Sequence, residues 1–104
     1  MRELMPEAVA ALHEAGKVIL LDVREPWEWE LCHVAGAVHI PMGQVPARRG
    51  ELPADRPVVV MCHHGMRSHQ VAQFLEAEGH ADVANLVGGI DAWARSVDTG
   101  LALY

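Results

Sequence analysis

A short apolar run that ends at a cysteine is the feature that most constrains this fold. Residues 58–61 are Val-Val-Val-Met, and Cys62 follows them directly. A run this short is typical of a buried strand rather than a helix, and Arg56-Pro57 before it marks where the strand begins. The sequence therefore predicts that a strand carries Cys62 to one edge of a sheet and releases it into a loop.

The loop after Cys62 leads into a predicted helix. Ser68 is a favourable N-cap residue, and Gly79 favours the end of the helix. Apolar residues recur between them at helical spacing, namely Val71, Ala72, Phe74 and Leu75. The loop is therefore expected to meet the N-terminus of a helix, where unpaired backbone N–H groups and the positive end of the dipole lie.

This position suits a cysteine nucleophile. A cysteine attacks as a thiolate, and its ordinary pKa of about 8.5 leaves only a few per cent ionised at neutral pH. Backbone N–H groups around Gly65, the helix dipole and the Arg67 guanidinium are three features able to stabilise the anion. We therefore interpret Cys62 as the catalytic residue.

The rest of the chain alternates between apolar runs and helical stretches. The predicted helices cover residues 6–16, 26–30, 44–49 and 90–94, and the other predicted strands cover residues 18–21, 37–40 and 83–87. The last residues are expected to form a surface tail. This alternation favours an α/β fold with a mostly parallel sheet, and a length of 104 residues fits one domain over residues 1–104.

Polar residues at the ends of two predicted strands indicate where a site would lie. Asp22 follows one apolar run and Cys62 follows another. In parallel sheets, ligands bind beyond the carboxyl ends of the strands. We expect Asp22 and Arg24 to support the site, because a carboxylate can accept backbone N–H bonds and an arginine can tie neighbouring segments together.

Composition and charge exclude several classes of partner. The chain has eight Lys and Arg residues against fourteen Asp and Glu residues, a formal net charge of −6, and no cluster of basic residues. We therefore expect neither nucleic acid nor a membrane as a partner. Two cysteines make no disulfide framework, and no segment has the pattern of a secretory signal peptide, so we expect a cytoplasmic location.

Three motifs together span nearly the whole chain. The first comprises Asp22-Val23-Arg24, Glu28-Trp29, His33-Val34-Ala35-Gly36-Ala37 and Ile40-Pro41. The second is Cys62-x-x-Gly65-x-Arg67 after an apolar strand, and the third is Leu86-x-Gly88-Gly89-Ile90 with Trp93 close behind. These motifs resemble those of the single-domain rhodaneses, a family of sulfurtransferases, although Cys32 stands where the family usually has glycine. This resemblance implies a three-layer domain whose five-stranded, mostly parallel sheet is flanked by helices.

The resemblance also implies a reaction. Cys62 would take the outer sulfur of a donor such as thiosulfate or a low-molecular-weight persulfide and pass it from a persulfide to cyanide, a thiol or a protein acceptor. Arg67 would pair with the oxyanion of the donor, the histidines would add positive charge at acidic pH, and Ser68 would donate to the sulfur. The expected substrate-binding residues are His63, His64, Gly65, Met66, Arg67 and Ser68. No cofactor is expected.

Two other functions fit parts of this pattern. Phosphatases that form a cysteinyl-phosphate, and the arsenate reductases, also place a cysteine and an arginine around a loop before a helix. Five residues separate the two there, whereas here only residues 63–66 separate Cys62 from Arg67, which favours a single sulfur atom over phosphate. Other rhodanese-like domains are non-catalytic binding modules or sulfur relays. Retention of Cys62, Gly65 and Arg67 argues against pure binding and leaves a relay open.

The second cysteine and the histidines suggest two further roles. Cys32 is expected to pack as a small apolar residue, with a disulfide to Cys62 as the alternative. His63, His64 and His69 lie close to Cys62, but adjacent ligands on one loop do not converge easily and no second pair of ligands follows. We therefore expect no metal ion.

Overall fold

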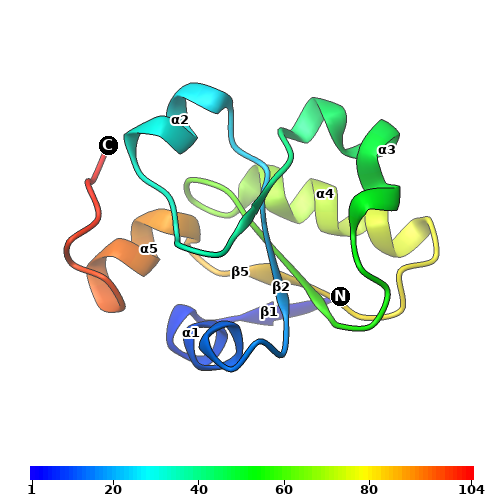
Figure 1. Ribbon diagram of the computed structural model, residues 1–104, viewed down its shortest axis with the longest axis horizontal. Helices are drawn as coiled ribbons and strands as arrows, with labels where there is room; N and C mark the ends of the chain where they lie inside the picture. The colour runs from blue at the N-terminus through cyan, green and yellow to red at the C-terminus, as the bar shows by residue number, and fades with distance from the viewer.

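Strand β4 (Val58–Met61) lies at the centre of the sheet in the computed structural model, which describes residues 1–104 (Figure 1). The five strands run in the order β1-β5-β4-β2-β3, and every neighbouring pair is parallel. The other strands are β1 (Arg2–Leu4), β2 (Ile19–Asp22), β3 (Val38–His39) and β5 (Val83–Leu86). The predicted α/β fold is confirmed, and its sheet is parallel throughout.

Helices cover both faces of the sheet, so the molecule has three layers (Figure 1). One face carries α3 (Val45–Arg48) and α4 (Met66–Ala77), with the short 3-10 turns η1 (Met42–Gln44) and η2 (Arg49–Glu51) beside α3. The other face carries α1 (Pro6–Glu14) and α5 (Gly89–Ser96), and α2 (Pro26–Leu31) follows β2. None of these helices combines the length and apolar character needed to cross a membrane.

Alternate residues of β4 build the two halves of the core. Val58 and Val60 pack with α4, whereas Val59 and Met61 pack on the side of α1 and α5. Every residue of β2, β4 and β5 is buried, which explains why these strands are apolar apart from Asp22 at the end of β2 and Asn85 in β5. Met61 pairs in register with Asp22, so the residues after β4 and β2 leave the sheet at the same rim.

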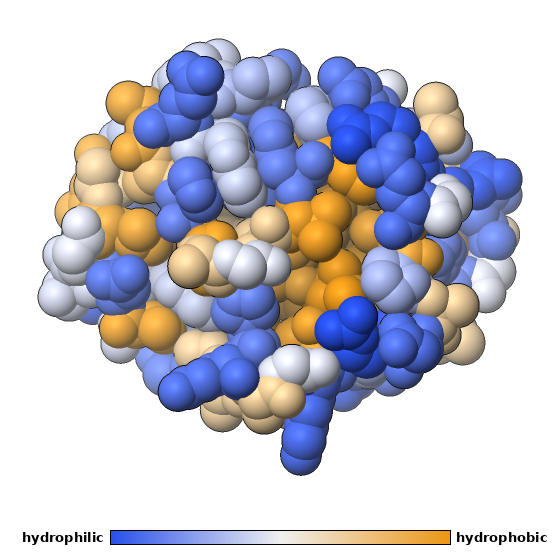
Figure 2. Space-filling model, viewed as in Figure 1, coloured by the Kyte–Doolittle hydropathy of each residue, from blue (hydrophilic) through white to orange (hydrophobic).

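An apolar groove crosses the face that bears α3 and α4. The groove has a volume of about 200 Å³ and is lined mainly by Met42, Val45, Pro46, Val71 and Phe74. Figure 2, viewed as in Figure 1, shows that apolar side chains also gather in the middle of the visible surface. The short α3 therefore leaves part of α4 uncovered.

Two features differ from the sequence-based prediction. Strand β1 was not predicted, because its sequence Arg-Glu-Leu is polar and it lies at the edge of the sheet, where charged side chains are common. Ser68 is not the N-cap of α4, because the helix begins at Met66 and Gly65 is the N-cap residue. Gly65 has a φ of 109°, a conformation that suits glycine, and this allows the helix to begin earlier.

The loop after β4 packs directly on the start of α5. The amide of Ile90 donates to the carbonyl of Cys62 at 2.8 Å, and the amide of Asp91 donates to the carbonyl of His63 at 3.1 Å. Gly89 permits this approach, because a Cβ there would lie 2.5 Å from one of these carbonyl oxygens and 2.4 Å from the other. The third sequence motif, Leu86-x-Gly88-Gly89-Ile90, therefore holds the Cys62 loop in place.

We expect Gly89→Ala to lower the free energy of unfolding by at least about 2 kcal/mol, because the added methyl group must displace the loop or the helix. Urea denaturation measures this change. Gly50→Ala is the matched control, since a Cβ there meets nothing within 4 Å; it should change stability by no more than about 0.5 kcal/mol. Equal stability of the two variants would contradict the close packing at Gly89.

Candidate active site

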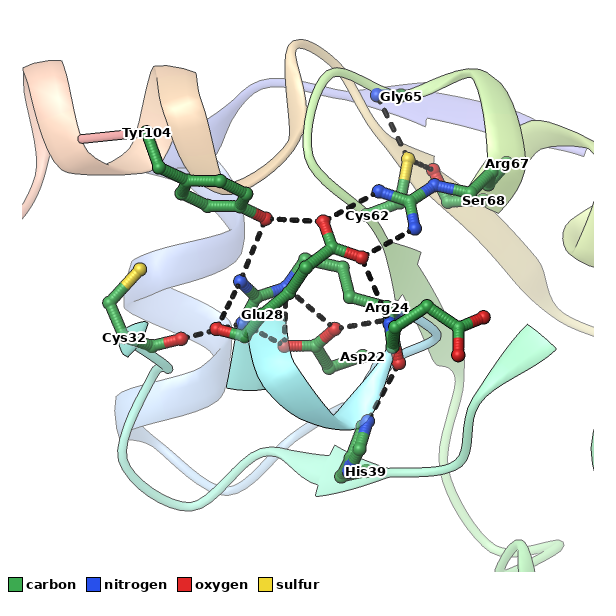
Figure 3. Close-up of polar contacts among 11 residues, drawn as sticks. Asp22, Arg24, Glu28, Cys32, His39, Cys62, Gly65, Arg67, Ser68 and Tyr104 are labelled. Carbon is green, nitrogen blue, oxygen red and sulfur yellow. Dashed lines mark hydrogen bonds and ion pairs between the residues drawn. The ribbon is translucent and has the colours of Figure 1, made fainter. Parts of the chain in front are cut away.

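The sulfur of Cys62 lies within a set of hydrogen-bond donors at the carboxyl end of β4 (Figure 3). The backbone N–H of Gly65 donates to Sγ at 3.1 Å, and the Ser68 hydroxyl lies 3.3 Å from Sγ. Gly65 and Ser68 belong to the cap and the first turn of α4. The sulfur therefore faces the N-terminus of this helix.

These donors lower the pKa of the Cys62 thiol. Burial by itself raises that pKa, because Cys62 is only 1% exposed and a charge is disfavoured away from water. The Ser68 hydroxyl and the backbone amides of Ser68, Gly65 and His64 act in the opposite direction, and the pKa falls below its ordinary value. The site therefore stabilises the thiolate relative to that of an ordinary cysteine.

Asn85 on β5 braces the donors, and the sequence analysis did not identify it. Its Oδ1 accepts from the Ser68 hydroxyl at 2.6 Å and so shares the one hydroxyl proton with the Cys62 sulfur, and its Nδ2 donates to the carbonyl of Gly65 at 3.2 Å. The side chain is 4% exposed. A lone polar residue within an apolar strand was the available signal, because a buried amide requires hydrogen-bond partners.

The Arg67 guanidinium is held by the carboxylate of Glu28 on α2 (Figure 3). Its Nη1 and Nη2 donate to the two carboxylate oxygens at 2.7 and 2.9 Å. This bidentate pair links α2 to the first turn of α4. Arg67 is thus paired within the protein, and the hydrogen bonds that lower the Cys62 pKa come from neutral groups instead.

Glu28 collects donors from several segments. Besides Arg67, it accepts hydrogen bonds from the hydroxyl of Tyr104 at 2.6 Å and from the backbone N–H of Glu25 at 3.0 Å. Its side chain is buried, which opposes ionisation. The donors outweigh burial, with Arg67 contributing most, and lower the pKa of Glu28 to about 2.

The expectation of a surface tail is wrong for its last residue, because Tyr104 packs over the site. Its ring stacks on the ring of His63 with centroids 3.8 Å apart and planes 4° apart. Its hydroxyl accepts a hydrogen bond from Arg24 at 2.9 Å and donates to Glu28. Burial raises the pKa of Tyr104 to about 12, so the hydroxyl stays protonated.

Asp22 and Arg24 form a buried ion pair beneath α2, and neither side chain is exposed. Nε and Nη2 of Arg24 donate to the carboxylate of Asp22 at distances from 2.7 to 3.1 Å. Other N–H groups of Arg24 donate to the carbonyls of Glu28 and Cys32. The Asp22 carboxylate accepts hydrogen bonds only from Arg24. The pair therefore positions α2 and does not touch the sulfur.

The other predicted loop residues lie around the rim of the site. Met66 is 79% exposed, and His64 is also exposed. The His63 ring is half-buried and stacks between the rings of His64 and Tyr104. Burial, and then the neighbouring His64, lower the pKa of His63, so this ring adds positive charge only at more acidic pH than expected.

Cys32 and Cys62 are both free and pack in different halves of the core. Cys62 belongs to the cluster that includes α4, and Cys32 belongs to the cluster that includes α1 and α5. Figure 3 shows Glu28 and Arg24 between them. A direct disulfide would require backbone movement, so this arrangement favours the interpretation of Cys32 as a packing residue.

The largest surface cavity lies away from the sulfur. It has a volume of about 630 Å³ and is lined by residues of α1, by Val18 and Ile19 at the start of β2, and by Trp93. None of residues 62–68 lines it. Gly65 and Met66 instead line a smaller cavity of about 430 Å³, and Cys62 lines neither of these cavities.

We expect Ser68→Ala to raise the pKa of the Cys62 thiol, because the hydroxyl is the strongest of the contacts that lower it. Alkylation of Cys62 by iodoacetamide at neutral pH, measured in a Cys32→Ser background, should slow several-fold. Ser96→Ala is the matched control, since the Ser96 hydroxyl donates to the carbonyl of Ala92 on an exposed part of α5. Measured over a range of pH, the alkylation rate should show the raised pKa. If its pH dependence is the same in Ser68→Ala as in the parent protein, the hydroxyl does not lower the pKa of Cys62.

Glu28 should make stability depend on pH. Its pKa is about 2 in the folded protein against an ordinary value of 4.5. The carboxylate therefore contributes stability above about pH 4.5, and this contribution is lost as the pH falls toward 2. Glu28→Gln should reduce the free energy of unfolding by about 3 kcal/mol at neutral pH, and the difference from the wild type should narrow below pH 4.5.

Urea unfolding at a series of pH values measures this difference. Glu30→Gln is the control, because Glu30 is exposed on the same helix. It should match the wild type at every pH. If the difference in free energy of unfolding between Glu28→Gln and the wild type stays constant down to pH 2, the charge of the carboxylate is not the source of the stabilisation.

Comparisons with known proteins agree with these features. The family model described as the rhodanese-like domain matches residues 5–96. A protein named "Sulfurtransferase" from Allochromatium vinosum is 42% identical over 84 residues, which cover 81% of this chain and 78% of that protein. The crystal structure of a rhodanese-like domain protein from Staphylococcus aureus has a TM-score of 0.84 at 28% identity, and the match covers 100% of this chain and 99% of that one.

A longer relative matches the chain over one part of its length. The "Probable adenylyltransferase/sulfurtransferase MoeZ" of Mycobacterium tuberculosis is 36% identical over 95 residues, which are 89% of this chain but 24% of that protein. The family model spans most of the chain, and the fold and the motif around Cys62 agree with it. The resemblance seen in the sequence is therefore confirmed, and this chain belongs to the rhodanese-like domain family of sulfur-transfer proteins.

Proposed function

We propose that this protein transfers a sulfane sulfur from a donor to a thiophilic acceptor through a persulfide on Cys62. The hydrogen-bonded sulfur carries the proposal, because Gly65 and Ser68 place donors 3.1 and 3.3 Å from Sγ. Such donors stabilise a thiolate before the reaction and a terminal persulfide anion after the first step. The relatives named as sulfurtransferases support this class of reaction.

The reaction consists of two displacements at sulfur. In the first, the Cys62 thiolate attacks the outer sulfur of a donor such as thiosulfate; a bond to Cys62 forms, the sulfur–sulfur bond of thiosulfate breaks, and sulfite leaves with the electron pair. In the second, cyanide or a thiolate attacks the outer sulfur of the persulfide, and the Cys62 thiolate leaves with the electron pair. Both steps balance without a cofactor.

The length of the loop and the hydrogen bonds within it support sulfur over phosphate as the group transferred. Four residues separate Cys62 from Arg67, and the observed donors converge on one sulfur atom. Arg67 turns to Glu28 and does not close a ring around the cysteine. A tetrahedral phosphate would require more donors around it than this loop presents.

Access to the sulfur requires movement, because Cys62 is 1% exposed. Figure 3 shows Arg67 beside the sulfur, the Glu28 carboxylate bound to Arg67, and Tyr104 on the far side of Glu28. In this proposal they form a cover that opens locally when the donor enters. An anionic donor can replace the Glu28 carboxylate on Arg67, because a guanidinium binds carboxylates and other oxyanions with the same pair of N–H groups.

The proposed donor is thiosulfate or a low-molecular-weight persulfide, and the acceptor is cyanide, a thiol or a protein. A reducing cytoplasm suits this chemistry. Both cysteines are free in the structure, and the nucleophile must stay reduced to react.

We expect the purified protein to gain one sulfur atom on Cys62 after incubation with thiosulfate or glutathione persulfide. Intact mass spectrometry followed by peptide mapping measures the gain and its position. Addition of cyanide should remove the sulfur and release thiocyanate. The second displacement regenerates the thiolate, so one protein molecule should release many thiocyanate ions.

Two variants serve as controls. Cys62→Ser should lose both sulfur loading and thiocyanate formation, and Cys32→Ser should retain both. Thiocyanate formation that persists in Cys62→Ser would exclude Cys62 as the nucleophile. Failure of every donor to load the wild-type protein would contradict sulfur transfer.

A further inference from the structure

Three metal-binding side chains meet where the Cys62 loop contacts α5. His63, His64 and Asp91 each offer one ligand atom, and these atoms all lie within 4.8 Å of one another. The sequence-based expectation of no metal rested on two grounds: adjacent ligands on one loop do not converge easily, and no second pair of ligands appears elsewhere in the chain. The fold supplies one, because α5 brings Asp91 to the two histidines from far along the chain.

The backbone beneath this cluster is held in place by hydrogen bonds. The amide of Asp91 donates to the carbonyl of His63 at 3.1 Å, and the amide of Ile90 donates to the carbonyl of Cys62 at 2.8 Å. Gly89 allows the two segments to touch. The backbones of His63 and Asp91 are therefore held next to one another, and His64 follows His63 directly in the chain.

The His63 ring provides a second, independent observation. It stacks between the rings of His64 and Tyr104, at centroid distances of 3.9 and 3.8 Å. Its Nε2 is buried and has no hydrogen-bond partner in the protein, the only buried side-chain nitrogen or oxygen of the chain in this position. A buried polar atom without a partner is unfavourable, and a bound cation would satisfy it.

We propose that His63, His64 and Asp91 form a binding site for a divalent transition-metal ion of the Zn²⁺ type. Two imidazoles and one carboxylate are ligands that Zn²⁺ prefers, and water can complete a tetrahedral shell. Tetrahedral ligation requires ligand atoms about 3.3 Å apart. Because His64 is exposed, its ring can swing out of the stack to reach this spacing.

The other groups near the cluster are compatible with this site. Arg95 donates to Oδ2 of Asp91 at 3.1 Å, which leaves the other carboxylate oxygen for a cation. The Cys62 sulfur faces Gly65 and Ser68 and is not among the clustered ligand atoms. The site is thus a histidine–carboxylate site on the outer side of the loop, distinct from the thiol.

Equilibrium dialysis of the full chain against Zn²⁺ at neutral pH, with metal analysis, tests the proposal. We expect one Zn²⁺ per chain. Asp91→Asn and His64→Gln, two conservative changes, should each weaken binding at least about tenfold. At about 100 times the Kd, Zn²⁺ should raise the Tm of the wild-type protein by about 10 °C and that of Asp91→Asn by much less.

Controls separate this site from binding by the thiols or by other histidines. Cys62→Ser, Cys32→Ser and His80→Ala should bind Zn²⁺ as the wild type does, and the Co²⁺-loaded protein should lack a sulfur-to-cobalt charge-transfer band. Imidazole resonances of His63 and His64 should shift on titration with Zn²⁺ in the unmodified chain, a measurement that requires no variant. Absence of stoichiometric binding, or binding that survives Asp91→Asn but is lost in Cys62→Ser, would overturn the proposal. Sulfur loading of Cys62 is measured without metal, so either proposal can fail alone.

Discussion

Two buried carboxylates and two guanidinium groups hold the carboxyl rim of this sheet together. Asp22 pairs with Arg24 and Glu28 pairs with Arg67, while the Tyr104 hydroxyl lies between Arg24 and Glu28. A charge is tolerated in a protein interior only when an opposite charge and hydrogen bonds compensate for the lost water. Loss of one partner in such a pair costs about 3–5 kcal/mol. The order of the rim therefore depends on the whole network being complete.

The sulfur site depends on this network through α4. Arg67 and Ser68 are neighbours in the first turn of the helix, so the ion pair to Glu28 also fixes the turn that directs a hydroxyl at Cys62. Asn85 fixes the same turn from β5. The donors that reach the sulfur are neutral, and their effect on the thiolate comes from their direction in a buried site rather than from net charge.

Burial of Cys62 has two consequences. It raises the pKa of the thiol, an effect that the hydrogen bonds outweigh, and it shields the sulfur from solvent. The side chains beside the sulfur come from α2, α4 and the C-terminal residue, which are joined by side-chain contacts and not by the sheet. Side-chain contacts can open while the sheet stays intact, so the proposed access by local motion leaves the strands in place.

Much of the fold followed from local patterns. The apolar runs of β2, β4 and β5 identified the central strands, because strands buried on both faces have no polar side. The motif from Cys62 to Arg67 identified the loop, and the direction of parallel strands placed it on the same rim as Asp22. The polar edge strand β1 and the cap at Gly65 were missed, since the first lacks an apolar pattern and the second depends on a positive φ that no neighbouring residue reveals.

The fold class and the position of Cys62 at a strand end could be predicted from local patterns, because burial and backbone preferences act over a few residues. The family could be predicted from the three motifs. The contacts of Arg67 with Glu28 and of Asn85 with Ser68, and the return of Tyr104 and Asp91 to the site, became visible only in the folded chain. Such pairs join residues far apart in the chain, and they form where separate elements pack together, so no spacing or periodicity in the sequence records them.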